Sequence, residues 1–442
     1  MVDPLSVLSA GFWLSFAGVA LLAWTLARDS GWRGHLKEIG LAPLLMTLAL
    51  LPLTVWFFGQ TSLVAPIANL VAVPFVSFVI VPINLGACAL LFAWPWAGQH
   101  LLQVCVYLVD GLWWFLEHLA AWRPAMQYLP ESSLLAFVLG CIGAIWLLAP
   151  RGVPVRALGA FLLLPLCWPR VLPPADGAFR ATVIDVGQGL SVLVRTHGHA
   201  LLVDAGARYP SGFDLGEAAV VPSLHALGVA HLDGLVISHG DNDHSGGAVS
   251  VLAAYPDTPV WGGEPARGSV AMRQCHAGQR WQWDGVDFRV LNPTVPVPAS
   301  SRDNDAGCVL LVTGTAGRLL LPADTSSRLE PAIAAAVPQG PPLVLVAPHH
   351  GSKTSSSEAY LEALQPRFAI ATTGYLNGYH HPAPEIAARY AALGIPLLNT
   401  PETGAVSIAF PARAAPSVVS GERQRQIRYW RESGSQMPDT AH

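Results

Sequence analysis

One stretch of the chain, from Leu41 to Val109, contains no Asp, Glu, Lys or Arg. A transmembrane helix needs roughly 20 apolar residues, so this run is long enough for about three spans. Residues 4–27 and 132–149 are also free of charge. Only 12% of the whole chain is charged, whereas ordinary soluble domains carry about 25%. We therefore expect the N-terminal part of the chain to lie in a lipid bilayer.

Six membrane spans are predicted within residues 1–172. They cover approximately residues 4–27, 41–58, 63–93, 100–121, 132–149 and 154–171. The third contains Pro66, Pro74 and Pro82, and it is either one kinked helix or two short ones. Asp110 and Glu117 lie in or beside the fourth span, where they either face a cavity or lie near a helix end. This part is predicted to be a polytopic α-helical membrane domain.

Basic residues give the expected orientation of these spans. Arg28, Arg33 and Lys37 follow the first span, and loops rich in Lys and Arg face the cytoplasm. With this loop in the cytoplasm and six spans in total, everything after about residue 172 is expected to lie outside the cytoplasm. The N-terminus lacks the layout of a signal peptide, because Asp3 stands where a basic region is expected.

The sequence pattern changes after a proline-rich stretch at residues 165–174. Short apolar runs such as ATVIDVG, ALLVDAG and LDGLVISHG alternate with Gly and Asp turns, and helical patterns lie between some of them. This alternation predicts an α/β sandwich over residues 175–412. Residues 413–442 are polar and predicted to be disordered, although their arginines and aromatics could also contact a single-stranded nucleic acid.

Cysteine spacing and net charge each argue against a feature that the chain could have had. The six cysteines are scattered and show no CxxC spacing, so neither a disulfide framework nor a cysteine metal site is predicted. The net charge is −4, which gives no overall electrostatic attraction for nucleic acid. Any contact with a polyanion would have to be local.

The segment SHGDNDHSGG at residues 238–247 follows an apolar strand pattern. It places four potential metal ligands in six residues, namely His239, Asp241, Asp243 and His244. Two adjacent carboxylates repel each other unless a cation lies between them. Carboxylate and imidazole ligands suit Zn²⁺ or Mn²⁺, and two such ions about 3.5–4 Å apart can activate water and stabilise a phosphoryl group. The segment therefore predicts a hydrolytic metal site rather than a solvated loop.

The same loop resembles the HxHxDH signature of the metallo-β-lactamase superfamily, with Asp241 in place of the second His. Further motifs resemble one branch of that superfamily, the ComEC-type DNA-internalisation competence proteins. These motifs are IDVGQGLSVLV, LLVDAG, NDAGCVLLV, LLLPAD and APHHGSKTSSS in the second half, and AGFWLSFAGVALL and LVAPIANLVAVPFVS in the first. The resemblance implies a membrane domain followed by a metallo-β-lactamase-fold αββα sandwich.

The resemblance also implies a set of metal ligands for two divalent ions, Zn²⁺ or Mn²⁺. His239 and Asp241 would bind one ion, and Asp243 and His244 the other. Asp324, at the end of a predicted strand, would bridge the two.

Three histidines complete the implied site. His349 or His350 would fill a coordination position, with His349 preferred and His350 left as a catalytic candidate. His381 would contact the phosphate or assist the leaving group. Asp243 would orient the water held between the ions and so is also a catalytic candidate.

Residues around the ligands are implied to support the site or the substrate. Asp185 and Gln188 would support it from the first turn of the domain, and Asp204 would orient loops. Asn304 and Asp305 stand where many superfamily members have a further metal-binding His.

Ser352 and Lys353 either bind phosphate or simply begin a helix. Two small differences from the family pattern, at Ala323 and Gly307, do not argue for an inactive domain.

The leading hypothesis is a protein of natural transformation in a bacterial inner membrane, which forms part of a channel for one DNA strand. Its metal domain would be a phosphodiesterase or nuclease outside the cytoplasm. Other uptake proteins and further copies of the chain are expected partners. The alternatives are a transporter whose metal fold is only a structural gate, and a membrane-anchored hydrolase of a non-DNA phosphodiester. The chain is also expected to be truncated at its N-terminus relative to this family.

Overall fold

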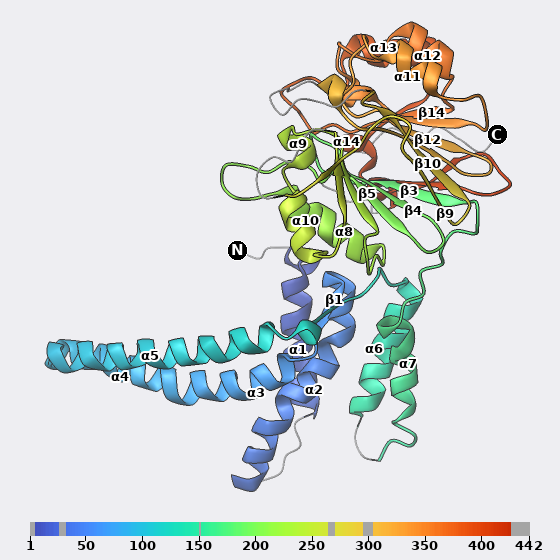
Figure 1. Cartoon of the computed structure of the whole chain (residues 1–442). Helices are drawn as coiled ribbons and strands as arrows, with labels where there is room; N and C mark the ends of the chain where they lie inside the picture. The colour runs from blue at the N-terminus through green and yellow to red at the C-terminus, as the bar shows by residue number, and fades with distance from the viewer. Residues whose placement is uncertain (1–4, 26–31, 150–151, 264–269, 295–303, 426–442) are drawn as a thin grey trace. The chain divides into compact units, whose positions relative to one another are not determined.

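The computed structural model describes the chain apart from residues 1–4, 26–31, 150–151, 264–269, 295–303 and 426–442 (Figure 1). The chain divides into two compact units. The first consists of Met1–Val171 with His225–Gly228, and the second of Leu172–Leu224 with Val229–His442.

The N-terminal unit is built mainly from apolar α-helices. Their bounds are α1 Ala10–Thr25, α2 Trp32–Phe58, α3 Ala65–Phe75, α4 Val81–Ala93, α5 Pro95–Ala120, α6 Leu134–Leu148 and α7 Leu158–Cys167, and two antiparallel strands are β1 Gln60–Ser62 and β2 Met126–Tyr128. Helices α6 and α7 pack closely, since a Cβ on Gly143 would lie 2.5 Å from the carbonyl oxygen of Gly159. Close approach at small residues is typical of helices packed in a membrane.

Residues 65–93 form one helical stretch despite their prolines. A single π-helical turn, Val76–Ile80, joins α3 to α4, and the Val81 amide donates to the carbonyl of Val76. Pro82 lies in the first turn of α4, where a missing N–H group matters least. The widened turn shifts the hydrogen-bond pattern by one residue and so lets the helix continue. Of the two possibilities left by the sequence, the structure has the single interrupted helix.

Two helical stretches of the described chain are long and apolar enough to cross a membrane, Leu41–Phe58 and Ala65–Ala93. Three shorter apolar helical segments are Ala10–Leu21, Leu134–Leu148 and Leu158–Cys167. Helix α5 is long enough but more polar, and it contains both Asp110 and Glu117, whose Oε1 accepts a hydrogen bond from Trp113 Nε1 at 2.6 Å. The six-span arrangement therefore stays a prediction.

The C-terminal unit contains two β-sheets. Their orders are β15-β14-β13-β12-β11-β10-β9 and β17-β16-β3-β4-β5-β6-β7-β8. The first sheet consists of β9 Arg280–Trp283, β10 Val286–Asn292, β11 Val309–Thr313, β12 Arg318–Leu321, β13 Leu343–Val346, β14 Phe368–Ala371 and β15 Leu397–Asn399. The second consists of β3 Phe179–Val183, β4 Val192–Arg195, β5 Ala200–Val203, β6 Gly234–Ile237, β7 Val260–Gly262, β8 Arg273–Gln274, β16 Val406–Phe410 and β17 Ser417–Gly421. The helices are α8 Val221–Ala226, α9 Asn242–Ser245, α10 Ala248–Ala254, α11 Glu330–Ala336, α12 Glu358–Leu364, α13 Pro384–Ala392, α14 Thr400–Thr403 and α15 Glu422–Arg425.

The two sheets pack face to face around a buried apolar core. Side chains alternate along each strand, so Leu310 and Val312 of β11 enter this core, whereas Val309 and Leu311 enter a second cluster. That second cluster lies between the seven-stranded sheet and helices α11, α12 and α13. Helices α8 and α10 lie beside the other sheet (Figure 1). The predicted αββα sandwich is confirmed.

Polar residues follow the parallel strands at their carboxyl ends, and these ends position the site. Strands β5 and β6 are parallel neighbours in one sheet, and β12, β13 and β14 are parallel neighbours in the other. The residues that follow them are Asp204, Ser238, His239, Asp324, His349, His350 and Thr372. Carboxyl ends of parallel strands are the usual place for ligands in α/β folds.

The start of the C-terminal tail differs from the expectation of disorder after residue 412. Residues 417–421 form the edge strand β17, which pairs antiparallel with β16. Its Val418 packs against the core between the sheets, and this burial stabilises the strand. The predicted single-strand contact near residue 430 lies outside the described residues.

The expectation of no disulfide is wrong, because Cys275 and Cys308 are bonded. Cys275 follows β8 and Cys308 precedes β11, so the bond joins the two sheets. The Cys308 amide donates to the Ser238 carbonyl at 2.8 Å, directly beside His239. The two cysteines are 33 residues apart, and only the packing of the sheets brings them together.

Candidate metal centre

Four side chains of the C-terminal unit converge on one point. One ligand atom from each of Asp243, His244, Asp324 and His350 lies within 4.8 Å of all the others. His244 Nε2 lies 3.1 Å from Asp324 Oδ1 and 3.2 Å from His350 Nε2. His350 Nε2 lies 3.3 Å from Asp243 Oδ2. We call these four residues the inner group.

A second set of ligand atoms lies around the other oxygen of Asp324. His349 Nε2 is 3.5 Å and His239 Nε2 is 3.9 Å from Asp324 Oδ2. Asp241 Oδ2 is 3.5 Å from His239 Nε2. We call His239, Asp241 and His349 the outer group. Asp324 stands between the groups, with one oxygen toward each.

One orphaned atom indicates that a cation fits here. His239 is buried, and its Nε2 has no hydrogen-bond partner in the described structure. A buried polar atom without a partner is unfavourable, and a divalent ion would satisfy it. Two imidazoles facing each other through Nε2, with carboxylates beside them, also form a donor set suited to Zn²⁺ or Mn²⁺.

Hydrogen bonds on the far side of each imidazole orient the rings. Asp204 Oδ2 accepts from His244 Nδ1 at 2.8 Å, and Thr372 Oγ1 lies 2.9 Å from His350 Nδ1. The hydroxyl of Ser238 lies 3.0 Å from His239 Nδ1 and donates to Asp204 at 2.7 Å. When Nδ1 carries the proton, Nε2 presents a lone pair to a metal.

Charges within the groups shift each other's protonation. Burial alone would raise the pKa of Asp324, but His244 and His350 hold that pKa well below its usual range. Burial alone would lower the pKa of His244, but Asp324 and Asp204 hold it well above its usual range. Metal binding must therefore displace a proton from His244, which couples metal affinity to pH.

Three further residues of the two groups, Asp241, Asp243 and His349, also have shifted pKa values. The imidazole of His239, whose Nε2 lies 3.5 Å from Asp241 Oδ2, lowers the pKa of Asp241. Burial opposes ionisation of Asp243, but His350 and His244 outweigh it and lower its pKa. Burial lowers the pKa of His349. The aspartates are thus held ionised, as metal ligands need to be.

His381 lies at the edge of this cluster. Its ring centroid is 6.1 Å from that of His349 and 5.8 Å from that of Tyr379. Its Nδ1 is buried and has no hydrogen-bond partner in the described structure. Burial, together with His350 and His349, lowers the pKa of His381.

Several residues implied by the resemblance have other partners. Asp185 accepts from Arg423 Nη2 at 3.0 Å, and Gln188 Oε1 accepts from the Gly374 amide at 3.3 Å. These two bonds link the first turn of the domain to segments near the site. Lys353 pairs with Glu385 at 3.2 Å, and Ser352 is buried with its hydroxyl 3.1 Å from that of Thr354.

The segment Asn304–Ala306 forms a short 3-10 turn. Asp305 accepts from the amide and hydroxyl of Ser326, at 2.7 and 2.8 Å, and from Arg328 at 2.8 Å. Ser326 follows Asp324 by two residues, so Asp305 braces the loop that carries the shared carboxylate.

Two site residues were not identified from the sequence, Ser238 and Thr372. Both are polar residues that follow a fully buried strand, β6 and β14 respectively. That position was a usable signal, but it is shared with other polar residues of the domain. Only the structure shows that their hydroxyls reach histidine Nδ1 atoms.

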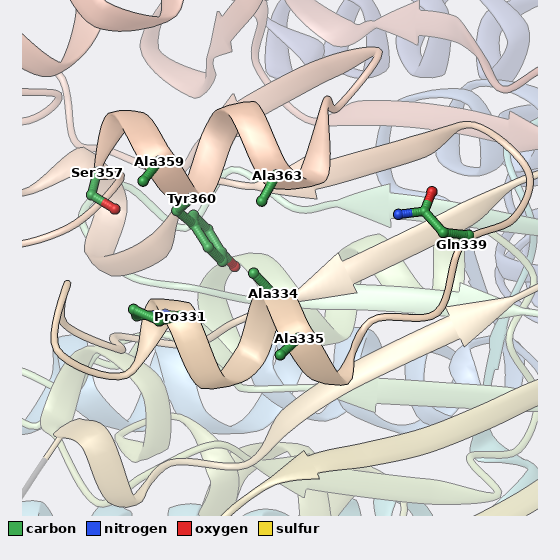
Figure 2. A pocket seen from close by; sticks show the side chains of 8 residues that line it. All are labelled: Pro331, Ala334, Ala335, Gln339, Ser357, Ala359, Tyr360 and Ala363. Atoms are coloured by element: carbon green, nitrogen blue, oxygen red, sulfur yellow. The ribbon is translucent and has the colours of Figure 1, made fainter.

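A pocket of about 370 Å³ lies elsewhere, beside helices α11 and α12 (Figure 2). Its lining residues are Pro331, Ala334, Ala335, Gln339, Ser357, Ala359, Tyr360 and Ala363. None of them belongs to the inner or outer group. The pocket is therefore separate from the metal centre.

Comparison with known proteins gives the same two-part organisation. The model of the family described as "Competence protein" matches residues 1–154, and that of the "Metallo-beta-lactamase superfamily" matches residues 184–374. The chain is 37% identical over 418 residues to competence protein ComA of Neisseria gonorrhoeae. This alignment covers 92% of the chain and 56% of ComA. It is 26% identical over 457 residues to ComE operon protein 3 of Bacillus subtilis, covering 93% of this chain and 57% of that protein.

A shorter match is to ribonuclease J of Mycolicibacterium smegmatis, with 29% identity over 96 residues, 20% of this chain and 17% of that protein. The chain spans little more than half the length of ComA and of ComE operon protein 3. The expected resemblance to competence proteins is confirmed, and the chain consists of a competence-protein domain followed by a metallo-β-lactamase superfamily domain.

Proposed function

We propose that the C-terminal unit is a metal-dependent phosphodiesterase that cleaves DNA, within a membrane protein of DNA uptake. The observation that carries this proposal is the position of Asp324 between two groups of ligand atoms, with one carboxylate oxygen toward each. Two ions sharing a carboxylate can stabilise both the attacking and the leaving oxygen of a phosphodiester.

The ligands of the proposed ions follow the inner and outer groups. Asp243, His244 and His350 would hold one ion, and His239, Asp241 and His349 the other, with Asp324 shared. His350 would thus be a ligand, although the sequence favoured His349 for that role, because His350 Nε2 lies within 3.6 Å of both Asp243 and Asp324. The bound ions would supply hydroxide near neutral pH and neutralise charge on the phosphate.

The chain's own residues would orient the substrate and move protons. Asp243 is the least buried member of the inner group, and its carboxylate would orient the attacking water. His381 would donate a hydrogen bond to the phosphate or the leaving oxygen, since a neutral imidazole still has one N–H group. Its lowered pKa favours that neutral form near pH 7.

DNA is the preferred substrate because of the named relatives. One relative that spans nearly the whole chain is named as a competence protein, and a shorter relative is named as a ribonuclease, an enzyme that acts on nucleic-acid phosphodiesters. A purely structural gate would not need so many ionised carboxylates close to Asp324.

The test uses the full chain in detergent with end-labelled single- and double-stranded DNA and added Mn²⁺ or Zn²⁺. We expect cleavage that stops with a chelator and in the Asp324→Asn variant. Asp287→Asn is the matched control, because Asp287 is an exposed residue of β10 and makes the same change of charge. Folded protein that binds metal but cleaves no DNA would refute the nuclease and favour the gate or another phosphodiester.

We further propose that the C-terminal unit lies on the outer side of a bacterial inner membrane. The Cys275–Cys308 disulfide supports this orientation, because disulfides persist in oxidising compartments and are rare in the cytosol. The orientation agrees with the basic residues after the first predicted span. The N-terminal unit would then form part of the path along which one DNA strand crosses the membrane.

Thiol trapping in intact cells tests the orientation. Cells are quenched with acid and labelled with a maleimide that adds mass, with or without prior reduction. We expect reduction to expose two additional thiols in the wild type and none in the Cys275→Ser/Cys308→Ser variant. Equal labelling of the wild type with and without reduction would place this unit in the cytoplasm.

A further inference from the structure

The exposed aromatic side chains of the C-terminal unit are concentrated on two loops. In the described part of this unit, they are Tyr209 and Phe213 on one loop and Tyr375 and Tyr379 on the other. Their exposed fractions range from 46% for Tyr209 to 72% for Tyr379. Single exposed apolar residues are ordinary, but rings gathered around one site indicate a surface that binds something.

The loop at residues 374–382 leads directly to the metal centre. The ring of Tyr379 stacks on that of His381 at 5.8 Å with an interplanar angle of 19°, and His381 contacts the ring of His349. Asn377 holds the loop in shape, since its side chain accepts from the His381 amide and donates to the carbonyls of Gly374 and His381. The exposed rings are thus presented by a braced loop.

The loop at residues 208–214 is anchored to the candidate metal-binding segment at residues 238–247. The Arg208 amide donates to Asn242 Oδ1 at 3.2 Å, and Asn242 lies between Asp241 and Asp243. At the other end, Asp214 is buried and accepts from Ser250 Oγ at 2.7 Å. The rings of Tyr209 and Phe213 lie 5.8 Å apart on this hairpin.

Several cations near the centre are already paired with carboxylates. Lys353 pairs with Glu385, Arg423 with Asp185 and Arg328 with Asp305, at 3.2, 3.0 and 2.8 Å. With a net charge of −4, the chain also lacks an overall attraction for polyanions. Recognition of a nucleic acid at this surface should therefore depend strongly on contacts with the bases, beside the contacts that the metal centre makes with one phosphate.

We propose that these two loops form a stacking site for the bases of an unpaired nucleic-acid strand whose phosphodiester reaches Asp324. Aromatic rings stack on unpaired bases and tolerate any sequence, because every base has a π face. In a duplex the bases are stacked on each other and are not accessible to the rings. The inference rests on the proposed phosphodiesterase and assigns it a single-stranded substrate.

Binding to the full chain in detergent, with chelator present so that no strand is cut, tests the stacking site. The probes are a short fluorescent oligothymidylate, an abasic strand of the same length and charge, and a blunt duplex. We expect the oligothymidylate to bind at least about tenfold more tightly than the other two. Since phosphate contacts are few, its affinity should fall only slightly with salt, by a power of about one to two.

Variants assign the effect to the rings. Tyr375→Ala/Tyr379→Ala and Tyr209→Ala/Phe213→Ala should each weaken oligothymidylate binding about tenfold and make intact and abasic strands bind alike. Tyr379→Phe keeps the ring and should keep the affinity. Val419→Ala is the matched control, because Val419 is an equally exposed apolar residue on β17.

Three results would overturn the proposal: equal binding of intact and abasic strands, alanine variants with unchanged affinity, or variants that instead lose binding to lipid vesicles. These failures are distinct from failure of the phosphodiesterase itself. Metal-dependent DNA cleavage without base-dependent binding would remove only the stacking site. Base-dependent binding without any cleavage would remove only the phosphodiesterase.

Discussion

Asp204 accepts a hydrogen bond from His244 Nδ1 at 2.8 Å, and both side chains are fully buried. The bond fixes the His244 ring so that Nε2 faces Asp324. The same carboxylate accepts from the amide and hydroxyl of Ser238, at 2.6 and 2.7 Å. One carboxylate behind the candidate ligands therefore holds both the His244 ring and the strand end that precedes His239.

Replacing Asp204 should weaken metal binding without removing a ligand. Asn has one acceptor oxygen in place of two, so Asp204→Asn cannot accept from both the Ser238 amide, which bonds Oδ1, and His244 Nδ1, which bonds Oδ2. We expect metal affinity to fall about 10- to 100-fold, measured by competition with a fluorescent chelator. Thr372→Val, which removes the partner of His350 Nδ1 at similar volume, should cause a smaller loss. Unchanged affinity in both variants would contradict the orienting role.

The shared position of Asp324 predicts a difference in metal content between two similar variants. Asp324→Asn should lose both ions, whereas Asp241→Asn should lose only the outer one, because Asp241 contacts only the outer group. Elemental analysis of purified protein gives the ratio of metal to protein, with Asp287→Asn as the control. Equal metal loss in the two variants would contradict a shared carboxylate.

The disulfide should stabilise the C-terminal unit measurably. Closing a loop of 33 residues removes conformational entropy from the unfolded chain, which corresponds to about 3–4 kcal/mol. Cys275→Ser/Cys308→Ser should therefore lower the free energy of unfolding by about that amount in denaturant titrations. Reductant should destabilise the wild type and the control Cys88→Ser, but not the double variant. A reductant effect that persists in the double variant would assign it to other cysteines.

The contribution of Asp284 to the free energy of unfolding should depend on pH in the acid range. Burial alone would raise its pKa, but hydrogen bonds from Thr196, the Gly198 amide and His199 lower the pKa to about 2. A depressed pKa means that the contribution is full above the unfolded value near 4 and is lost as the pH falls toward 2. These bonds join the β9–β10 turn to the β4–β5 turn of the other sheet.

Asp284→Asn should reduce the free energy of unfolding at neutral pH by no more than about 1 kcal/mol, because the pairing is partly exposed. The difference between wild type and variant should shrink between about pH 4 and pH 2. Unfolding titrations across that range measure it, with Asp287→Asn as the control. A difference that grows on acidification would contradict the sign of the pKa shift.

The sequence alone determined the sandwich and the ligand loop of this protein. A strand that is covered on both faces needs apolar residues throughout, so short continuous apolar runs such as that of β11 identify strands without knowledge of their neighbours. His239, Asp241, Asp243 and His244 lie within six residues, and their spacing predicts them as ligands on its own. Asp324 and the His349–His350 pair were assigned from motifs that resemble a family.

The tertiary structure decided which atoms face each other. The division of Asp324 between two groups, the bond from Thr372 to His350 and the Cys275–Cys308 disulfide all join segments that are distant in sequence. The exposure of the aromatic loops also became visible only in the fold, where Tyr379 is exposed and Tyr360 is buried. Such contacts depend on how strands from two sheets end beside each other, and no local periodicity encodes that arrangement.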